Sequence, residues 1–188
     1  MKLEIGFEND EKLKFTLKGA GVGFSNMLRR FAIGQVPTYA VSNVTMYENT
    51  SSIFSEYIAH RVGLVPLKSA HIGKKGEDVM LTLEATGPCT VMSKELKSGH
   101  EKVKISNPGI PIVLLTEDQN LRLEAKATLG TGREHARHQP GIVSYEIAGD
   151  ELRFIAESFS QMPPREIIIR AAEIIEERCE ELEEQLKQ

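Results

Sequence analysis

The 188-residue sequence has no tryptophan, two cysteines and no long apolar run. A membrane-spanning helix needs about 20 consecutive apolar residues, and the sequence contains no such stretch. Residues 1–5 hold neither an apolar segment nor a small-residue cleavage site, so they do not resemble a signal peptide. We therefore expect a cytoplasmic protein that does not bind membranes.

The two cysteines, Cys89 and Cys179, lie far apart, and neither belongs to a Cys-x-x-Cys pair. This spacing excludes a disulfide framework and a zinc site built from thiolates. We expect both thiols to be buried as small apolar groups.

The net charge is −4, which argues against a protein whose main task is non-specific binding of nucleic acid. The charge is uneven, because residues 165–187 contain eight Glu against three Arg and one Lys. A hydrophobic fraction of 40% is sufficient for a packed core.

Alternating apolar and polar residues predict a hairpin of residues 3–7 and 13–17 with one buried face. Further strands are expected at 39–47, 79–85, 89–93, 102–106, 111–115, 121–129, 142–147 and 152–157. Ser25 is the predicted N-cap of a helix that ends near Gln35, and a second helix is expected at 53–62. Their predicted apolar sides are Met27, Leu28, Phe31 and Ala32 in the first helix and Ile53, Tyr57, Ile58 and Val62 in the second.

The closing helix, from Pro163 to Lys187, gives the strongest local pattern. Its apolar residues are spaced 4, 3, 4, 3, 4, as in a heptad seam. The seam consists of Ile168, Ala172, Ile175, Cys179, Leu182 and Leu186. The pattern fits an ordinary amphipathic helix or a partner-binding helix. A length of about 36 Å favours the second interpretation, since a domain this small covers only part of it.

Three motifs contain residue types that could carry chemistry. Gly19, Gly21 and Gly23 precede a helix, but Phe24 replaces the last glycine of a dinucleotide fingerprint, so a turn that permits positive φ is the better interpretation.

Glu134, His135 and His138 lie in a Gly- and Pro-rich loop without a third strong metal ligand, which favours polar contact with a partner over metal binding. We find no catalytic motif. The adjacent Arg29 and Arg30 fit a solvated helix face or a site that recognises carboxylates.

Four motifs in order carry a family resemblance. They are Asn26-x-Leu28-Arg29-Arg30, His60-Arg61-x-Gly63-Leu64-x-Pro66-Leu67, Gly132-Arg-x-His135-Ala-x-x-Gln139-Pro140 and the stretch 159–164. Together they resemble the family of the archaeal DNA-directed RNA polymerase D subunits, which includes the third-largest eukaryotic subunit and the bacterial alpha subunit.

The resemblance implies an α+β fold with a discontinuous dimerisation domain, residues 1–40 and 143–188, made of a small antiparallel sheet with two packed helices. A β-rich domain, residues 41–142, would be inserted into it. Many archaeal relatives add a cysteine-rich iron–sulfur domain after the Gln-Pro motif, but here Pro140 is followed within a few residues by the next predicted strand. We therefore expect no iron–sulfur cluster, and no zinc, since Cys89 is the only thiol of the middle region.

The resemblance also implies a non-catalytic assembly subunit of the DNA-directed RNA polymerase. It would form a heterodimer with subunit L, bind the small subunits N and P, and contact the large subunits. Asn26, Leu28, Arg29 and Arg30 would face the second-largest subunit, and Arg61, His135 and Gln139 are expected to join such contacts. Phe24 and Phe31 on the first helix, together with the seam of the closing helix, complete the predicted interface.

Two other functions compete with this one. A free-standing homodimeric binding protein of the same fold is disfavoured because Glu-rich helices would repel each other. A small hydrolase or nucleotide-binding enzyme would need a catalytic set, which the sequence does not offer.

Overall fold

A computed structural model of the protein describes residues 1–69, 77–101 and 103–187. The chain forms two compact units. Unit 1 contains Met1–Pro37 and Thr131–Gln188, and unit 2 contains Thr38–Gly130. The structure thus places residues 131–142, which the sequence assigned to the inserted domain, in unit 1, and residues 38–40, which the sequence assigned to the dimerisation domain, in unit 2. In the described part of the chain, no helix is long and apolar enough to cross a membrane.

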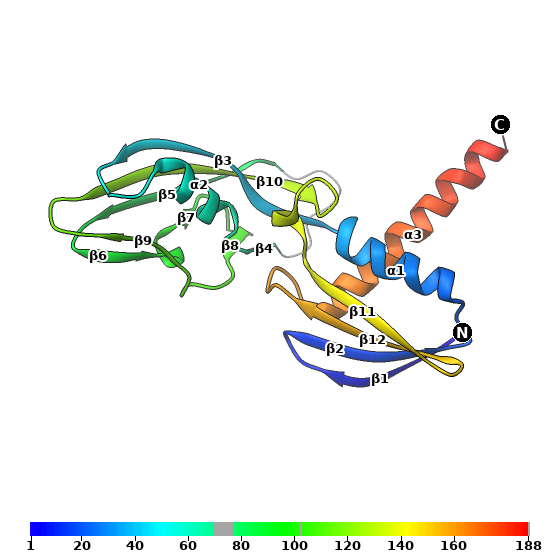
Figure 1. Ribbon diagram of the computed structural model, residues 1–188. Helices are drawn as coiled ribbons and strands as arrows, with labels where there is room; N and C mark the ends of the chain where they lie inside the picture. Colours follow the sequence, from blue (N-terminus) through cyan, green and yellow to red (C-terminus); the bar gives the residue numbers. More distant parts are fainter. Residues whose placement is uncertain (70–76, 102, 188) are drawn as a thin grey trace. The chain divides into compact units, whose positions relative to one another are not determined.

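Unit 1 is built on a four-stranded antiparallel sheet with the order β1-β2-β12-β11 (Figure 1). Its strands are β1 (Lys2–Glu8), β2 (Lys12–Lys18), β11 (Gly141–Ala148) and β12 (Glu151–Ser158). Two hairpins from opposite ends of the chain meet where β2 pairs with β12. The pairing explains why this unit needs both ends of the sequence.

Two helices, α1 (Val22–Gly34) and α3 (Pro164–Leu186), contact each other and the sheet of unit 1. The core between them includes Phe15 and Phe154, whose rings stack with centroids 4.8 Å apart. From α3, the buried residues are Pro164, Ile167, Ala171 and Ile175. Unit 1 therefore buries one helical stripe of α3 in its own core.

The local predictions for unit 1 need two corrections. The first helix begins at Val22 with Gly21 as N-cap, so Ser25 is a buried residue inside α1 and not its cap. The hairpin is confirmed, but its buried face belongs to β2 alone, because the apolar residues of the edge strand β1 remain exposed. Gly19 does adopt a positive φ of 69°, as the glycine-rich turn predicted.

Unit 2 is rich in strands. Its largest sheet has the order β3-β10-β5-β7, formed by β3 (Pro37–Asn49), β10 (Asn120–Thr131), β5 (Val79–Thr86) and β7 (Lys97–Ser98). Two smaller antiparallel pairs are β4 (Leu67–Ser69) with β8 (Val103–Ile105), and β6 (Cys89–Met92) with β9 (Pro111–Leu115). The predicted strands of this region are confirmed, except that residue 102 lies outside the described residues. The short strands β4 and β7 were not predicted.

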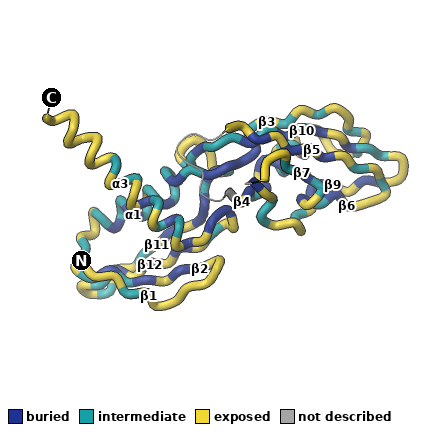
Figure 2. The backbone as a smooth tube through the Cα atoms, turned by 180° about the vertical axis from the view of Figure 1, so that it is seen from behind, coloured by how far each residue is buried: buried dark blue, intermediate teal, exposed yellow. Residues whose placement is uncertain are grey.

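Buried residues alternate with exposed ones along β5 and with mostly half-buried ones along β10 (Figure 2), so one face of each strand lines the core of unit 2. The helix α2 (Ser55–Gly63) adds Ile58 and Val62 to this core. Ile53 and Tyr57 were predicted on the same side, but both are exposed. Ile53 precedes the helix, so the helical spacing does not apply to it.

Both cysteines are exposed, and the prediction of buried thiols is wrong. Cys89 begins β6, which pairs only with β9. Cys179 follows Ile175, the last buried residue of α3. Cys89 is thus exposed although its cross-strand partner Leu115 is buried, whereas Cys179 lies beyond the core of unit 1.

Candidate partner-binding interface

The two adjacent arginines of α1 have different surroundings. The Nε and Nη2 atoms of Arg29 donate to Asn26 Oδ1 over 3.2 and 3.0 Å, so this half-buried side chain is held along its own helix. Arg30 is exposed. Because the two side chains differ in this way, Arg30 is the one that is open to a partner.

A cleft of about 690 Å³ lies beside Arg30 in unit 1. It is lined by Gly23, Asn26, Met27, Arg30, Phe31, Gly34, Gln35 and Arg133. No acidic residue lines it, and in the described part of the chain neither Arg30 nor Arg133 pairs with a carboxylate. The half-buried side chains of Met27 and Phe31 supply apolar surface between these polar groups. Such a cleft is suited to a carboxylate next to an apolar side chain.

The loop that follows β10 brings Arg133 to this cleft. The backbone N–H of Arg133 donates to the carbonyl of Gly34 over 2.9 Å. A Cβ atom on Gly132 would lie 2.3 Å from the carbonyl oxygen of Ile33, so only glycine allows the loop to approach α1 this closely. The position of Arg133 therefore depends on Gly132.

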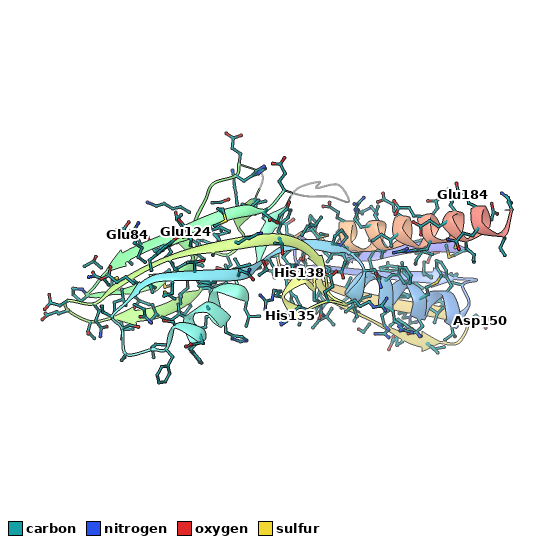
Figure 3. The ribbon with its side chains drawn as sticks, turned by 90° about the horizontal axis from the view of Figure 1, so that it is seen from above. Glu84, Glu124, His135, His138, Asp150 and Glu184 are labelled. Carbon is teal, nitrogen blue, oxygen red and sulfur yellow. The ribbon has the colours of Figure 1, made fainter. Side chains whose placement is uncertain are left out.

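His135, labelled in Figure 3, and Gln139 both form hydrogen bonds within or next to the loop that contains them. His135 Nδ1 accepts hydrogen bonds from the backbone N–H and the Nε–H of Arg137, both over 3.1 Å. Gln139 Nε2 donates to the carbonyl of Gly141 over 2.9 Å. His138 is buried. Among the described residues, no group of three His, Cys, Asp or Glu side chains is placed to hold a metal ion.

Arg61 lies in unit 2, on α2, and Nη2 of its side chain donates to the carbonyl of Pro111. Its Nε is buried and has no hydrogen-bond partner among the described residues. The side chain therefore ties α2 to the start of β9. This contact lies within unit 2, and the expected contact of Arg61 with a partner protein stays a prediction.

Burial changes along α3, as the colours of Figure 2 show. Ile175 of the predicted seam is only 8% exposed and belongs to the core, whereas Leu182 and Leu186 are 58% and 79% exposed. Ile168 is half-buried, while Ala172 and Cys179 are exposed. The seam therefore leaves its own unit after Ile175, because the core contacts only the first half of the helix.

The apolar residues of α1 also fall into two groups, one buried in the core and one half-buried at its edge. Leu28, a predicted interface residue, is only 4% exposed and lies in the core of unit 1. Phe24 and Phe31 are half-buried and pack against that core from outside. Leu28 thus supports the helix from within, and the part of α1 that can meet a partner comes from its neighbours.

An exposed ion pair fixes the start of α3 to the sheet. Arg165 Nε and Nη2 donate to the carboxylate of Glu8 at the end of β1. The hydrogen bond from Arg165 lowers the pKa of Glu8. This pair joins the first strand to the closing helix, which are 157 residues apart in sequence.

Comparison with known proteins places these features in a family. Residues 44–145 match the family model described as the RNA polymerase Rpb3/RpoA insert domain. The DNA-directed RNA polymerase subunit Rpo3 of Methanocaldococcus jannaschii is 42% identical over 178 residues, which cover 94% of this chain and 91% of that protein. The chain belongs to this family of RNA polymerase subunits.

The relatives differ in length. Rpo3 of Pyrococcus furiosus is 44% identical over 153 residues, which cover 78% of this chain and 59% of that protein. Rpo3 of Natronomonas pharaonis is 40% identical over 160 residues, which cover 80% of this chain and 65% of that protein. The chain therefore spans most of one Rpo3 relative and about three fifths of these two.

Sequence reasoning missed the juxtaposition of Arg30 and Arg133. Both occur in the motifs that carry the resemblance, but about 100 residues separate them. The signal that was available is Gly132, since glycine is the residue that permits a close approach of the backbone to another element.

Proposed function

We propose that this chain is a non-catalytic assembly subunit of a DNA-directed RNA polymerase that forms a heterodimer with subunit L. In this proposal unit 1 is the discontinuous dimerisation domain and unit 2 is the inserted β-rich domain. The dimer then binds the small subunits N and P and offers a platform to the large subunits. The protein works in the cytoplasm and meets DNA only within the assembled enzyme.

One observation carries the pairing function: α3 continues for 11 residues beyond Ile175, its last buried position, with Leu182 and Leu186 exposed. Burying apolar surface contributes about 25 cal/mol per Å², so a partner that covers these side chains stabilises the pair. The half-buried Phe24 on α1 adds to the same surface in this proposal.

The cleft between Arg30 and Arg133 supports a second contact, with the second-largest subunit. Its two guanidinium groups lack carboxylate partners in the described structure, and an arginine fork recognises a carboxylate through two hydrogen bonds. Arg29 contributes by keeping Asn26 in place at the edge of this cleft.

No metal or iron–sulfur cluster takes part in this function. The sequence has two cysteines, and they lie in different units. Elemental analysis of the purified chain should find less than stoichiometric iron and zinc. A stoichiometric metal that survives dialysis against a chelator would contradict this part of the proposal.

Co-expression with subunit L tests the pairing. Leu182→Asp together with Leu186→Asp should abolish co-purification, because each change would bury a carboxylate in an apolar contact. Leu114→Asp is the matched control, since Leu114 is also exposed but lies on β9 in unit 2. A wild-type chain that forms a stable homodimer and ignores subunit L would support the homodimeric alternative instead.

Reconstitution of the polymerase tests the cleft separately. Arg30→Glu and Arg133→Glu should each leave the heterodimer with subunit L intact and weaken its association with the large subunits. Arg122→Glu, a change of the same charge in unit 2, should have little effect. If all three variants assemble equally well, the cleft does not bind a large subunit.

A further inference from the structure

The exposed second half of α3, residues 176–186, carries an apolar stripe that continues from Ile175. The stripe contains Cys179, Leu182 and Leu186, which are all exposed. Exposed apolar residues at heptad spacing are typical of helices that pack against another helix. The charged residues beside the stripe indicate which kind of helix can bind there.

A residue's direction on a helix follows from 3.6 residues per turn. Glu176 and Glu183 lie along one edge of the stripe, and Arg178 and Gln185 lie along the other. These are the flanking positions that set partner choice in paired helices. Glu176 has no ion-pair partner among the described residues, whereas Glu183 accepts from Lys187 Nζ over 2.9 Å. Arg178 already pairs with Glu181 over 2.9 Å.

The charge of this segment is one-sided. Residues 176–187 contain six Glu against Arg178 and Lys187, so the segment carries a net charge of −4, equal to the net charge of the whole chain. Two such segments placed side by side would double that negative charge along one contact. A helix with positive flanks would instead pair with Glu176 and Glu183.

We propose that the apolar stripe of α3 selects an amphipathic helix of a different chain, whose apolar side chains are flanked by Lys or Arg, over a second copy of this chain. This inference rests on the proposed function and specifies the chemistry of the partner at that surface. The leucines provide the contact area, and Glu176 and Glu183 decide between partners. Charge complementarity of this kind chiefly controls specificity.

A matched pair of variants separates the edge of the stripe from the rest of the helix. Glu176→Lys with Glu183→Lys reverses charge beside the stripe. Glu180→Lys with Glu184→Lys makes the same change in net charge at two exposed positions on the far side of α3, where Figure 3 labels Glu184. All four residues follow the last buried position, so neither variant should alter the melting temperature of the full chain strongly.

The probes are two synthetic helical peptides with the same leucine stripe, one flanked by lysines and the other by glutamates. Binding to the full chain is measured by fluorescence anisotropy. The lysine-flanked peptide should bind about tenfold more tightly in 0.1 M salt, where charges still interact over about 10 Å, and this preference should largely disappear in 1 M salt. The edge variant should lose or invert the preference, and the far-side variant should keep most of it.

A single cysteine beside the stripe locates the bound peptide. With Cys89→Ser and Cys179→Ala as background, a photo-reactive maleimide on Gln185→Cys should cross-link the lysine-flanked peptide. Absence of this cross-link, or an equal loss of preference in both charge variants, would mean that the peptide binds by general charge attraction and would overturn the inference. Tight homodimerisation of the wild-type chain in sedimentation would overturn it as well.

Failure of the proposed function gives a different result. If the chain does not co-purify with the polymerase from its native cells, the proposed function fails whatever the peptides show. If it does co-purify with the polymerase but the two peptides bind equally, only the inference about partner charge fails.

Discussion

Replacing Gly132 by alanine should destabilise unit 1 and displace Arg133 from the cleft. The added Cβ would lie 2.3 Å from the carbonyl oxygen of Ile33, a backbone atom that cannot move alone. Overpacking of this kind costs about 1–3 kcal/mol. If the loop moves away to relieve it, the 2.9 Å hydrogen bond from Arg133 to Gly34 is lost, which costs about 0.5–1.5 kcal/mol more. The expected loss in free energy of unfolding is about 2–4 kcal/mol.

Urea denaturation followed by circular dichroism measures this loss in the full chain, which has no tryptophan to report by fluorescence. Gly23→Ala is the control, because Gly23 lies in α1 and a Cβ there would meet nothing within 4 Å. This control should stabilise the helix by roughly 0.5–1 kcal/mol. An unfolding midpoint for Gly132→Ala equal to that of the wild type would refute the close approach of the loop to α1.

Two further predictions concern α3. Ile167→Ala should lower the free energy of unfolding by about 2–5 kcal/mol, because the side chain is fully buried. Leu186→Ala should change that free energy by less than about 0.5 kcal/mol and should weaken only the pairing with a partner. Equal effects of the two variants in thermal unfolding would contradict the division of α3 into a buried first half and an exposed second half. The pKa of Glu8 is lowered in the folded chain by Arg165, so this pair stabilises the fold above the ordinary pKa of glutamate, about 4.3, and the contribution is lost as the pH falls through the lowered value. Glu8→Gln should therefore flatten the decline of stability in acid, measured as the melting temperature between about pH 6 and pH 3; an unchanged slope would refute the pair.

The elements of the fold could largely be predicted from local patterns. The alternation in residues 121–129 predicted a strand, and the structure has β10 there. The prolines at 163 and 164 predicted the start of α3, and Pro163 is its N-cap. These signals work because strand alternation and the missing N–H of proline act within a few residues. Ser25 failed as a cap because the helix already begins at Val22, with Gly21 as its N-cap.

The candidate interface was only partly predictable. The seam of α3 was visible as a spacing of apolar residues, but the spacing could not tell Ile175 in the core from Leu182 outside it. Both positions carry the same chemistry in the sequence. Their difference arises because the core of unit 1 contacts only the first half of the helix.

The sequence by itself determined most of the strands, the approximate positions of the helices and the membership of the family, since these depend on local spacing and on motifs that lie within single segments. Tertiary structure alone decided which apolar residues remain exposed and which arginine side chains lie side by side at the cleft. Arg30 and Arg133 come together because Gly132 lets a loop reach α1. Contacts between residues so far apart depend on how the chain packs, and no local pattern specifies that packing.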